Sequence, residues 1–224
     1  MDIRINPPAP YGSGNPNPDR NAMLLAMNEM KSTLAELEQC LQGHPPDLAQ
    51  ANRYIDEILQ DVQKVNDAAG GDVDITPEIQ QMMGIVQDAQ TMIQSSDALG
   101  ALLVMNDPRS LFSQDITNIY SYITGGTPEP PTPSPEWQAF FKDYSVYREY
   151  MYEFKVDLQK GDTEEANRIF GYVMTAAIRL LKDSGDDPLI SPQVAQLLGH
   201  LQDINLLLQQ NDYSGCLAIL NQYF

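Results

Sequence analysis

Apolar residues recur at three- and four-residue intervals along most of the chain, which is the pattern of amphipathic helices. In the C-terminal half this pattern predicts a helix over Pro135–Gln159. The next predicted helix has its apolar residues between Ala166 and Leu181, and Asp162 followed by Glu165 is typical of an N-cap. We therefore expect an all-helical fold.

Two further helices are predicted towards the C-terminus. Ser191 followed by Pro192 is predicted to cap the first of them, because a proline in the first turn has no N–H that needs a partner. Its apolar stripe runs over Val194–Leu208. Asn211–Asp212 is predicted to cap a last, short helix that contains Leu217.

The chain is similar to itself at an offset of 115 residues. At this offset Ala51–Asp107 aligns with Ala166–Gln222 without a gap, and 16 of the 57 pairs are identical. Composition alone would give about four identities. Thr76–Pro77 corresponds to Ser191–Pro192, which places a helix start at the same point of each half. We interpret the similarity as a tandem duplication, and we expect two bundles of four to five helices each.

The pattern divides the chain into four segments. Residues 22–124 form the first predicted module, which ends with an additional amphipathic segment at Leu111–Ile123. Residues 135–224 form the second module, where the chain ends at Phe224 before a counterpart of that segment. Residues 1–21 are rich in Pro, Asn and Gly, and we expect a disordered tail there.

Residues 125–134 join the two modules and are rich in proline. Such a segment favours extended polyproline II geometry and acts as a semi-rigid spacer. Its prolines also have the P-x-x-P spacing that aromatic grooves of other proteins recognise. Both readings, spacer and ligand, apply to the same four residues: Pro128, Pro130, Pro131 and Pro133.

The order of these motifs resembles a known family. An Ile-[Ser/Thr]-Pro helix start occurs at Ile75–Pro77 and at Ile190–Pro192, and a polar loop over Asn211–Leu217 precedes the final helix. Glu38–Leu41 and Ser113–Ile116 extend the likeness, the latter at the family's fifth helix. The order is similar to that of the C-terminal helical domain shared by the steroid receptor RNA activator protein and the outer-coat subunit of COPII vesicles. The resemblance implies a non-catalytic helical bundle that contacts other proteins in coat- or coregulator-type assembly.

The formal net charge is −18, from 31 acidic and 13 basic side chains. This charge opposes contact with phosphate backbones and anionic membranes, so we expect no nucleic-acid partner. No apolar stretch approaches the roughly 18 to 20 residues that span a bilayer, so we expect no membrane insertion. The N-terminus also lacks the apolar core of a signal peptide, which predicts a protein of the cytoplasm or nucleus.

Residues with metal-binding or catalytic potential are few and scattered. His44 and His200 have no clustered ligands nearby in the sequence, and Cys40 and Cys216 occupy non-equivalent places in the two modules. We expect the cysteines to be reduced, and we expect no metal and no cofactor. The sequence also has no phosphate-binding loop or nucleophile elbow. We therefore expect a protein without enzymatic activity.

The helix predicted at Pro135–Gln159 is unusually aromatic, with eight aromatic residues among the 18 of Trp137–Phe154. They cover more than one stripe, so most should lie in the core while some of Tyr147, Tyr150 and Tyr152 stay exposed. Aromatic residues are favoured at protein interfaces because they bury much surface at low entropic cost. The candidate contact residues, with the other module or with a partner, are Trp137, Phe141, Tyr144, Tyr147, Tyr150 and Tyr152.

Together these features predict a helical scaffold or adaptor that binds other proteins. The alternative is a structural subunit of a large assembly or of a secreted filament, for which an acidic helical composition is also suitable. Self-association is compatible with both.

Overall fold

The computed structural model describes residues 18–43, 45–126, 135–185, 187–188 and 190–224. These residues form helices joined by short turns, and no strand occurs among them, which confirms the predicted all-helical fold. Residues 1–17 of the predicted tail and the prolines of the predicted linker lie outside the described residues, as does His44. The end of the predicted tail is wrong, because Arg20 and Asn21 belong to the first helix, which Asp19 caps. The helices are α1 (Arg20–Leu41), α2 (Leu48–Ala69), α3 (Thr76–Gln94), α4 (Ala98–Asn106), α5 (Leu111–Ile123), α6 (Pro135–Lys160), α7 (Thr163–Ser184), α8 (Ile190–Gln209) and α9 (Tyr213–Tyr223).

Aspartate side chains start most of the helices for which a cap is described. In each case the carboxylate accepts a hydrogen bond from the backbone N–H three residues later, which satisfies a donor that the first turn leaves unpaired. The predicted caps Asp162 and Asp212 are confirmed, with N–H donors at Glu165 and Gly215. The other capping aspartates are Asp19, Asp47 and Asp97.

The predicted capping role of Ser191, and of Thr76 at the corresponding position, is wrong. Both residues lie inside their helices, and both hydroxyls donate backwards to a carbonyl: Ser191 Oγ to Gly185 at 2.6 Å, and Thr76 Oγ1 to Asp72 at 2.6 Å. A hydroxyl that donates to the preceding turn closes the connection between two helices but satisfies no N–H of the new helix. For α8 that task falls to Asp187, which accepts from Ile190 N at 3.0 Å.

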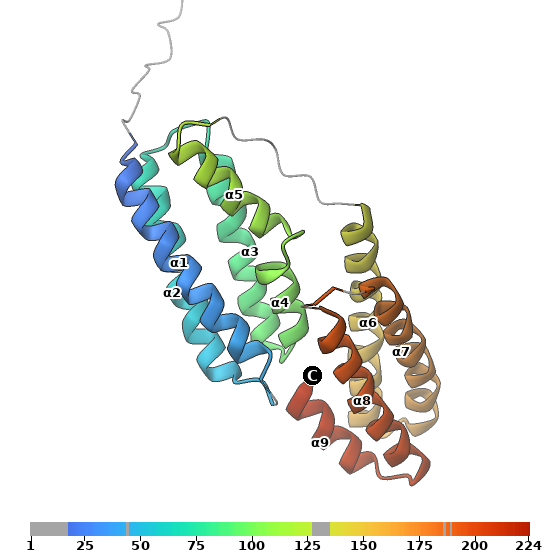
Figure 1. The fold of residues 1–224 in the computed structure, drawn as a ribbon. Helices are drawn as coiled ribbons and strands as arrows, with labels where there is room; N and C mark the ends of the chain where they lie inside the picture. Colours follow the sequence, from blue (N-terminus) through green and yellow to red (C-terminus); the bar gives the residue numbers. More distant parts are fainter. Residues whose placement is uncertain (1–17, 44, 127–134, 186, 189) are drawn as a thin grey trace, which may run out of the picture.

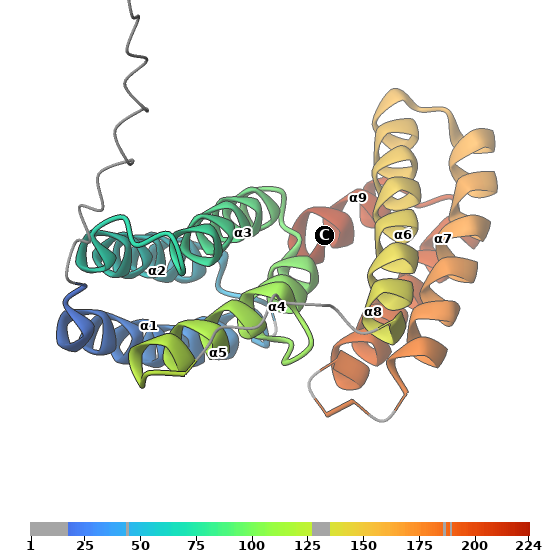
Figure 2. The ribbon, with the colours of Figure 1, turned by 90° about the horizontal axis from the view of Figure 1, so that it is seen from above.

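The helices form two groups in space, α1–α5 and α6–α9 (Figure 1), and the buried residues form two hydrophobic clusters that follow this division. One lies within α1–α5, which we call the first bundle, and the other within α6–α9, which we call the second bundle. Figure 2, seen from above, shows the same division, with α4 at the side of the first bundle that faces the second. Leu103 of α4 is the exception to the division, because it belongs to the cluster of the second bundle.

Helices α2, α3 and α4 of the first bundle correspond to α7, α8 and α9 of the second at the 115-residue offset. Helix α2 begins at Leu48 and ends at Ala69, and α7 begins and ends 115 residues later. Left-handed backbone occurs at corresponding turns, with φ of 63° at Ser96 and 57° at Asn211. The buried faces of α3 and α8 also correspond, at Ile75, Ile79, Met82, Val86, Ala89 and Ile93 in one and Ile190, Val194, Leu197, Leu201, Ile204 and Leu208 in the other.

The first helix of each bundle follows a different offset. The buried residues of α1 at 23, 27, 30, 34, 37 and 41 correspond to those of α6 at 140, 144, 147, 151, 154 and 158, an offset of 117. The difference between the two offsets arises in the connection that follows the first helix. In the first bundle this connection runs from Leu41 to Leu48, and in the second it is shorter and runs from Lys160 to Thr163. The shorter connection keeps α6 in contact with α7 while shifting its apolar stripe by two residues.

Helix α5 has the bounds that the sequence predicts, and it carries a buried acid. Asp115 is fully buried, and neither of its carboxylate oxygens has a hydrogen-bond partner in the described part of the chain. Glu78, at the start of α3, is a nearby carboxylate that opposes ionisation. Burial first, and Glu78 second, raise the pKa of Asp115 to about 7.

This acid makes the stability of the fold depend on pH. The folded chain keeps the Asp115 proton up to about pH 7, whereas the unfolded chain loses it near 3.8, so stability should fall between these values as the pH rises. We expect Asp115→Asn to change little at pH 4 and to stabilise by about 2 kcal/mol at pH 8. Urea unfolding of the variant and of Glu57→Gln, which removes an exposed carboxylate, checks this. Equal effects of Asp115→Asn at both pH values would contradict it.

Candidate binding groove between the two bundles

Helix α4 holds the two bundles together because it is apolar all round. From Ala98 to Met105 it has no polar side chain, and a helix of this kind is stable only when it is covered on all sides. One face, with Ala101 and Met105, packs into the first bundle. The other face, with Leu99 and Leu103 one turn apart, packs into the second.

Asp97 connects the bundles at the start of α4. Its carboxylate caps the helix by accepting from Gly100 N at 2.8 Å, and the missing side chain of Gly100 leaves room for it. The same carboxylate accepts a hydrogen bond from the Tyr144 hydroxyl of α6 and forms an ion pair with Arg148 Nε at 2.7 Å. Burial raises the pKa of Asp97, which Arg148 and the hydrogen bonds from Tyr144 and Gly100 oppose. The cap therefore doubles as an interbundle contact.

A second polar contact lies at the other end of α4. Arg109 Nη2 is 2.8 Å from Asp107 Oδ2, in its own bundle, and 3.0 Å from Asp187 Oδ2, at the start of α8. Asp107 is fully buried, and Asp187 also caps α8. The guanidinium of Arg109 thus joins the α4–α5 corner to the start of α8.

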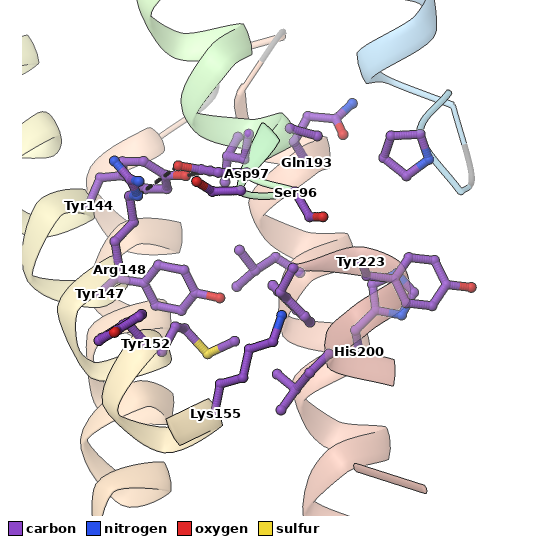
Figure 3. A pocket seen from close by; sticks show the side chains of 18 of the residues that line it. Ser96, Asp97, Tyr144, Tyr147, Arg148, Tyr152, Lys155, Gln193, His200 and Tyr223 are labelled. Carbon is purple, nitrogen blue, oxygen red and sulfur yellow. Dashed lines mark hydrogen bonds and ion pairs between the residues drawn. The ribbon is translucent and has the colours of Figure 1, made fainter. Parts of the chain in front are cut away.

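Between the bundles lies a groove of about 440 Å³, which we call the interbundle groove. Its walls come from α6, α8 and α9 of the second bundle, and from the start of α4 and the α1–α2 corner of the first (Figure 3). Apolar side chains line much of it, among them Met151, Leu197 and Leu220. A concave site of this size and lining is typical of a binding site.

Polar side chains also line the groove, and Tyr147, Lys155 and His200 are three of them. Tyr147 is almost fully buried, and its hydroxyl points into the groove (Figure 3). Lys155 extends into the same space from two turns further along α6. On the opposite wall the His200 ring of α8 stacks on Tyr223 of α9, with ring centroids 3.9 Å apart. Burial, and to a lesser degree Asp97, raise the pKa of Tyr147 well above its ordinary value, so its hydroxyl stays a donor.

The six predicted contact residues of α6 have different positions. Trp137 is buried and stacks on Phe141, with centroids 4.9 Å apart, and Phe141 packs against the core of the first bundle. Tyr144 and Tyr147 are buried at the groove, whereas Tyr150 is half-buried and lies against Tyr172. Tyr152 is 71% exposed at the groove rim. Several of these residues therefore contact the other bundle, and recognition of a partner by them stays a prediction.

Other residues singled out in the sequence lie apart from one another. Cys40 is half-buried in α1 and Cys216 is buried in α9, and both are free thiols. Within the described ranges, no group of three or more His, Cys, Asp or Glu side chains is arranged to hold a metal ion. None of the helices described is both long and apolar enough to cross a membrane.

The role of α4 and Asp97 as the contact between the bundles was not predicted from the sequence. The signal was present in the alignment of the two halves. Leu99 and Leu103 correspond to Ser214 and Ala218 of α9, so the first half has a second apolar stripe that the other lacks. An apolar stripe that is present in only one of two corresponding helices indicates that this helix buries an additional face.

In comparisons with known proteins, no family model, no curated protein and no solved structure matches this chain. The resemblance to the steroid receptor RNA activator and COPII outer-coat domain therefore stays a hypothesis that rests on the order of motifs.

Replacing the second stripe of α4 should separate the bundles. The double variant Leu99→Ser and Leu103→Ala introduces the residues of α9 at these positions, and Leu103→Ala alone should cost about 2–5 kcal/mol of interbundle packing. The first bundle should stay folded, because Ala101, Leu102 and Met105 still hold α4. Small-angle scattering should then show a larger radius of gyration.

The matched control is Leu25→Ser with Leu206→Ala, since these leucines are 62% and 54% exposed. It should leave the radius of gyration unchanged. A compact Leu99/Leu103 variant with full helical circular dichroism would contradict the role of α4.

Proposed function

We propose that this chain is a non-catalytic, helical scaffold protein that binds a segment of another protein in the interbundle groove. The observation that carries the proposal is the groove itself, because it combines apolar walls with aromatic residues at its rim. Protein interfaces are enriched in Tyr, Trp, Phe and Met, and a partner segment commonly inserts apolar side chains between helices. The exposed Tyr152 and the half-buried Tyr223 provide such a rim.

The same proposal includes a tandem duplication. The corresponding bounds of α2 and α7, the left-handed residues Ser96 and Asn211, and the equivalent buried positions of α3 and α8 support it. In this account the two modules diverged at the outer face of α4, and the groove exists only where both meet. A single bundle would supply only part of its walls.

The family resemblance gives a more specific form of this proposal. A domain similar to that of the steroid receptor RNA activator protein and the COPII outer-coat subunit would serve coat- or coregulator-type assembly, in the cytoplasm or nucleus. The order of helices and the Ile75–Pro77 and Ile190–Pro192 starts support it. The net charge of −18 supports a protein partner over a nucleic acid.

The alternative is a structural subunit of a large assembly or filament. One observation favours it: Ile178 and Leu181, one turn apart on α7, are 57% and 38% exposed. An apolar pair at this spacing can meet a second copy. Such a subunit would polymerise, whereas a scaffold that uses the groove would stay monomeric or dimeric.

Blocking the groove tests the proposal directly. Peptides displayed on phage would be selected on the full chain and then measured as synthetic peptides. Val156→Trp places a large ring in the groove, so it should weaken binding of the selected peptides at least tenfold. Val73→Trp, at a residue 81% exposed and outside the groove, should leave binding unchanged. Equal binding to both variants, or selection of no common motif, would refute the proposal.

A further inference from the structure

The interbundle groove differs in charge from the rest of the molecule. The chain as a whole has a net charge of −18. Among the side chains that line the groove the one carboxylate is Asp97, which is paired with Arg148, so the ammonium group of Lys155 has no side-chain carboxylate beside it in this lining. An ammonium group without a counter-charge, in a chain that is otherwise strongly acidic, favours a negatively charged group of a ligand at this point.

The hydroxyl of Tyr147 has no hydrogen-bond partner in the part of the chain that the structure describes. The residue is only 3% exposed, and its hydroxyl points into the groove (Figure 3). A buried donor without a partner costs about 1–3 kcal/mol, which phenylalanine at this position would avoid. The hydroxyl is therefore placed to donate to a ligand.

Lys155 lies on the same face of α6. Tyr147, Met151 and Lys155 are spaced four residues apart, and such residues form one row along a helix. Lys155 is half-buried and has neither an ion pair nor a hydrogen bond with the described residues, in contrast to Lys64, which pairs with Glu29 and Asp61. Its ammonium group extends into the space that the Tyr147 hydroxyl faces (Figure 3).

The apolar side chains of the groove favour an apolar group in the remainder of the ligand. Met151 lies between the two polar groups on α6, and Leu197 and Leu220 line the opposite wall. One cation and one neutral donor match a single negative charge, whereas a doubly charged phosphate needs more cations than the groove supplies. The lining thus combines an apolar contact with a place for one carboxylate.

We infer that the interbundle groove binds a partner segment that presents an apolar side chain beside a carboxylate. The apolar side chain packs between Met151 and Leu197, and the carboxylate accepts hydrogen bonds from Lys155 Nζ and the Tyr147 hydroxyl. The carboxylate comes either from an acidic side chain or from the C-terminus of the partner. This inference rests on the proposed function and adds the chemistry of the partner to it.

Three short peptides test the inference on the full chain. They are N-acetyl-Ala-Leu-Ala-Leu-Leu with a free C-terminal carboxylate, the same peptide as its C-terminal amide, and the amide with Glu as its third residue. Binding is followed through the methyl group of Met151 by NMR. At least one of the two acidic peptides should bind about five- to tenfold more tightly than the neutral amide. The one that binds more tightly identifies the source of the carboxylate.

Variants assign the effect to the groove. Lys155→Met should make the three dissociation constants equal, and Tyr147→Phe should weaken the acidic peptides about threefold without changing the neutral amide. Lys142→Met removes an exposed lysine of the same helix and should keep the preference.

Other outcomes overturn the inference. Equal binding of all three peptides by the unmodified chain, or a preference that survives Lys155→Met, would show that no carboxylate is recognised there. The effect of Val156→Trp on selected peptides would still stand, so the proposed function would survive. If none of the three peptides shifts the signal of the Met151 methyl group, the groove is no site for an acidic peptide.

Discussion

The arrangement of this molecule depends on the burial of α4 on both of its sides. A helix with no polar face is unstable at a surface, and the first bundle can cover only the side with Ala101 and Met105. The second bundle covers Leu99 and Leu103. Docking then brings Asp97 out of water, where its charge is tolerated because Tyr144 and Arg148 supply a hydrogen bond and an ion pair. The interbundle groove is the space that this docking leaves between α6, α8 and the corner of the first bundle.

A comparison of α4 with the corresponding helix α9 shows which residues let α4 contact the other bundle. Asp97 and Asp212 both cap a helix through the N–H three residues later, and Gly100 and Gly215 leave the same room for the carboxylate. Yet Asp212 is exposed, because α9 carries Ser214 and Ala218 where α4 carries the two leucines of its second stripe. At the start of α4 the interface therefore uses a capping motif that α9 also has, together with two leucines that α9 lacks.

Local sequence patterns were sufficient to predict the helices, but they were insufficient to predict the groove. The bounds of α5, the start of α6 at Pro135 and the Asp162 cap follow from periodicity and capping, which depend on neighbours in the chain. The capping roles given to Thr76 and Ser191 failed, because a hydroxyl at a helix start can equally donate to the preceding carbonyl. Tyr147 was among the tyrosines expected at the surface, but it is buried. The reason is that α6, with its eight aromatic residues, contacts both bundles. Which aromatic stripe of α6 packs against which bundle depends on residues that are distant in the sequence.

The central claim is that α4 makes one rigid body of the two bundles, and nuclear spin relaxation tests it most directly. Backbone ¹⁵N relaxation rates report the overall tumbling of each helix on the nanosecond timescale. If α4 is buried on both sides, the amides of α1–α5 and of α6–α9 will fit one common rotational diffusion tensor, of the size expected for a 25.0 kDa particle. Two separate tensors with shorter correlation times would show bundles that tumble independently, and would contradict both the role of α4 and the groove.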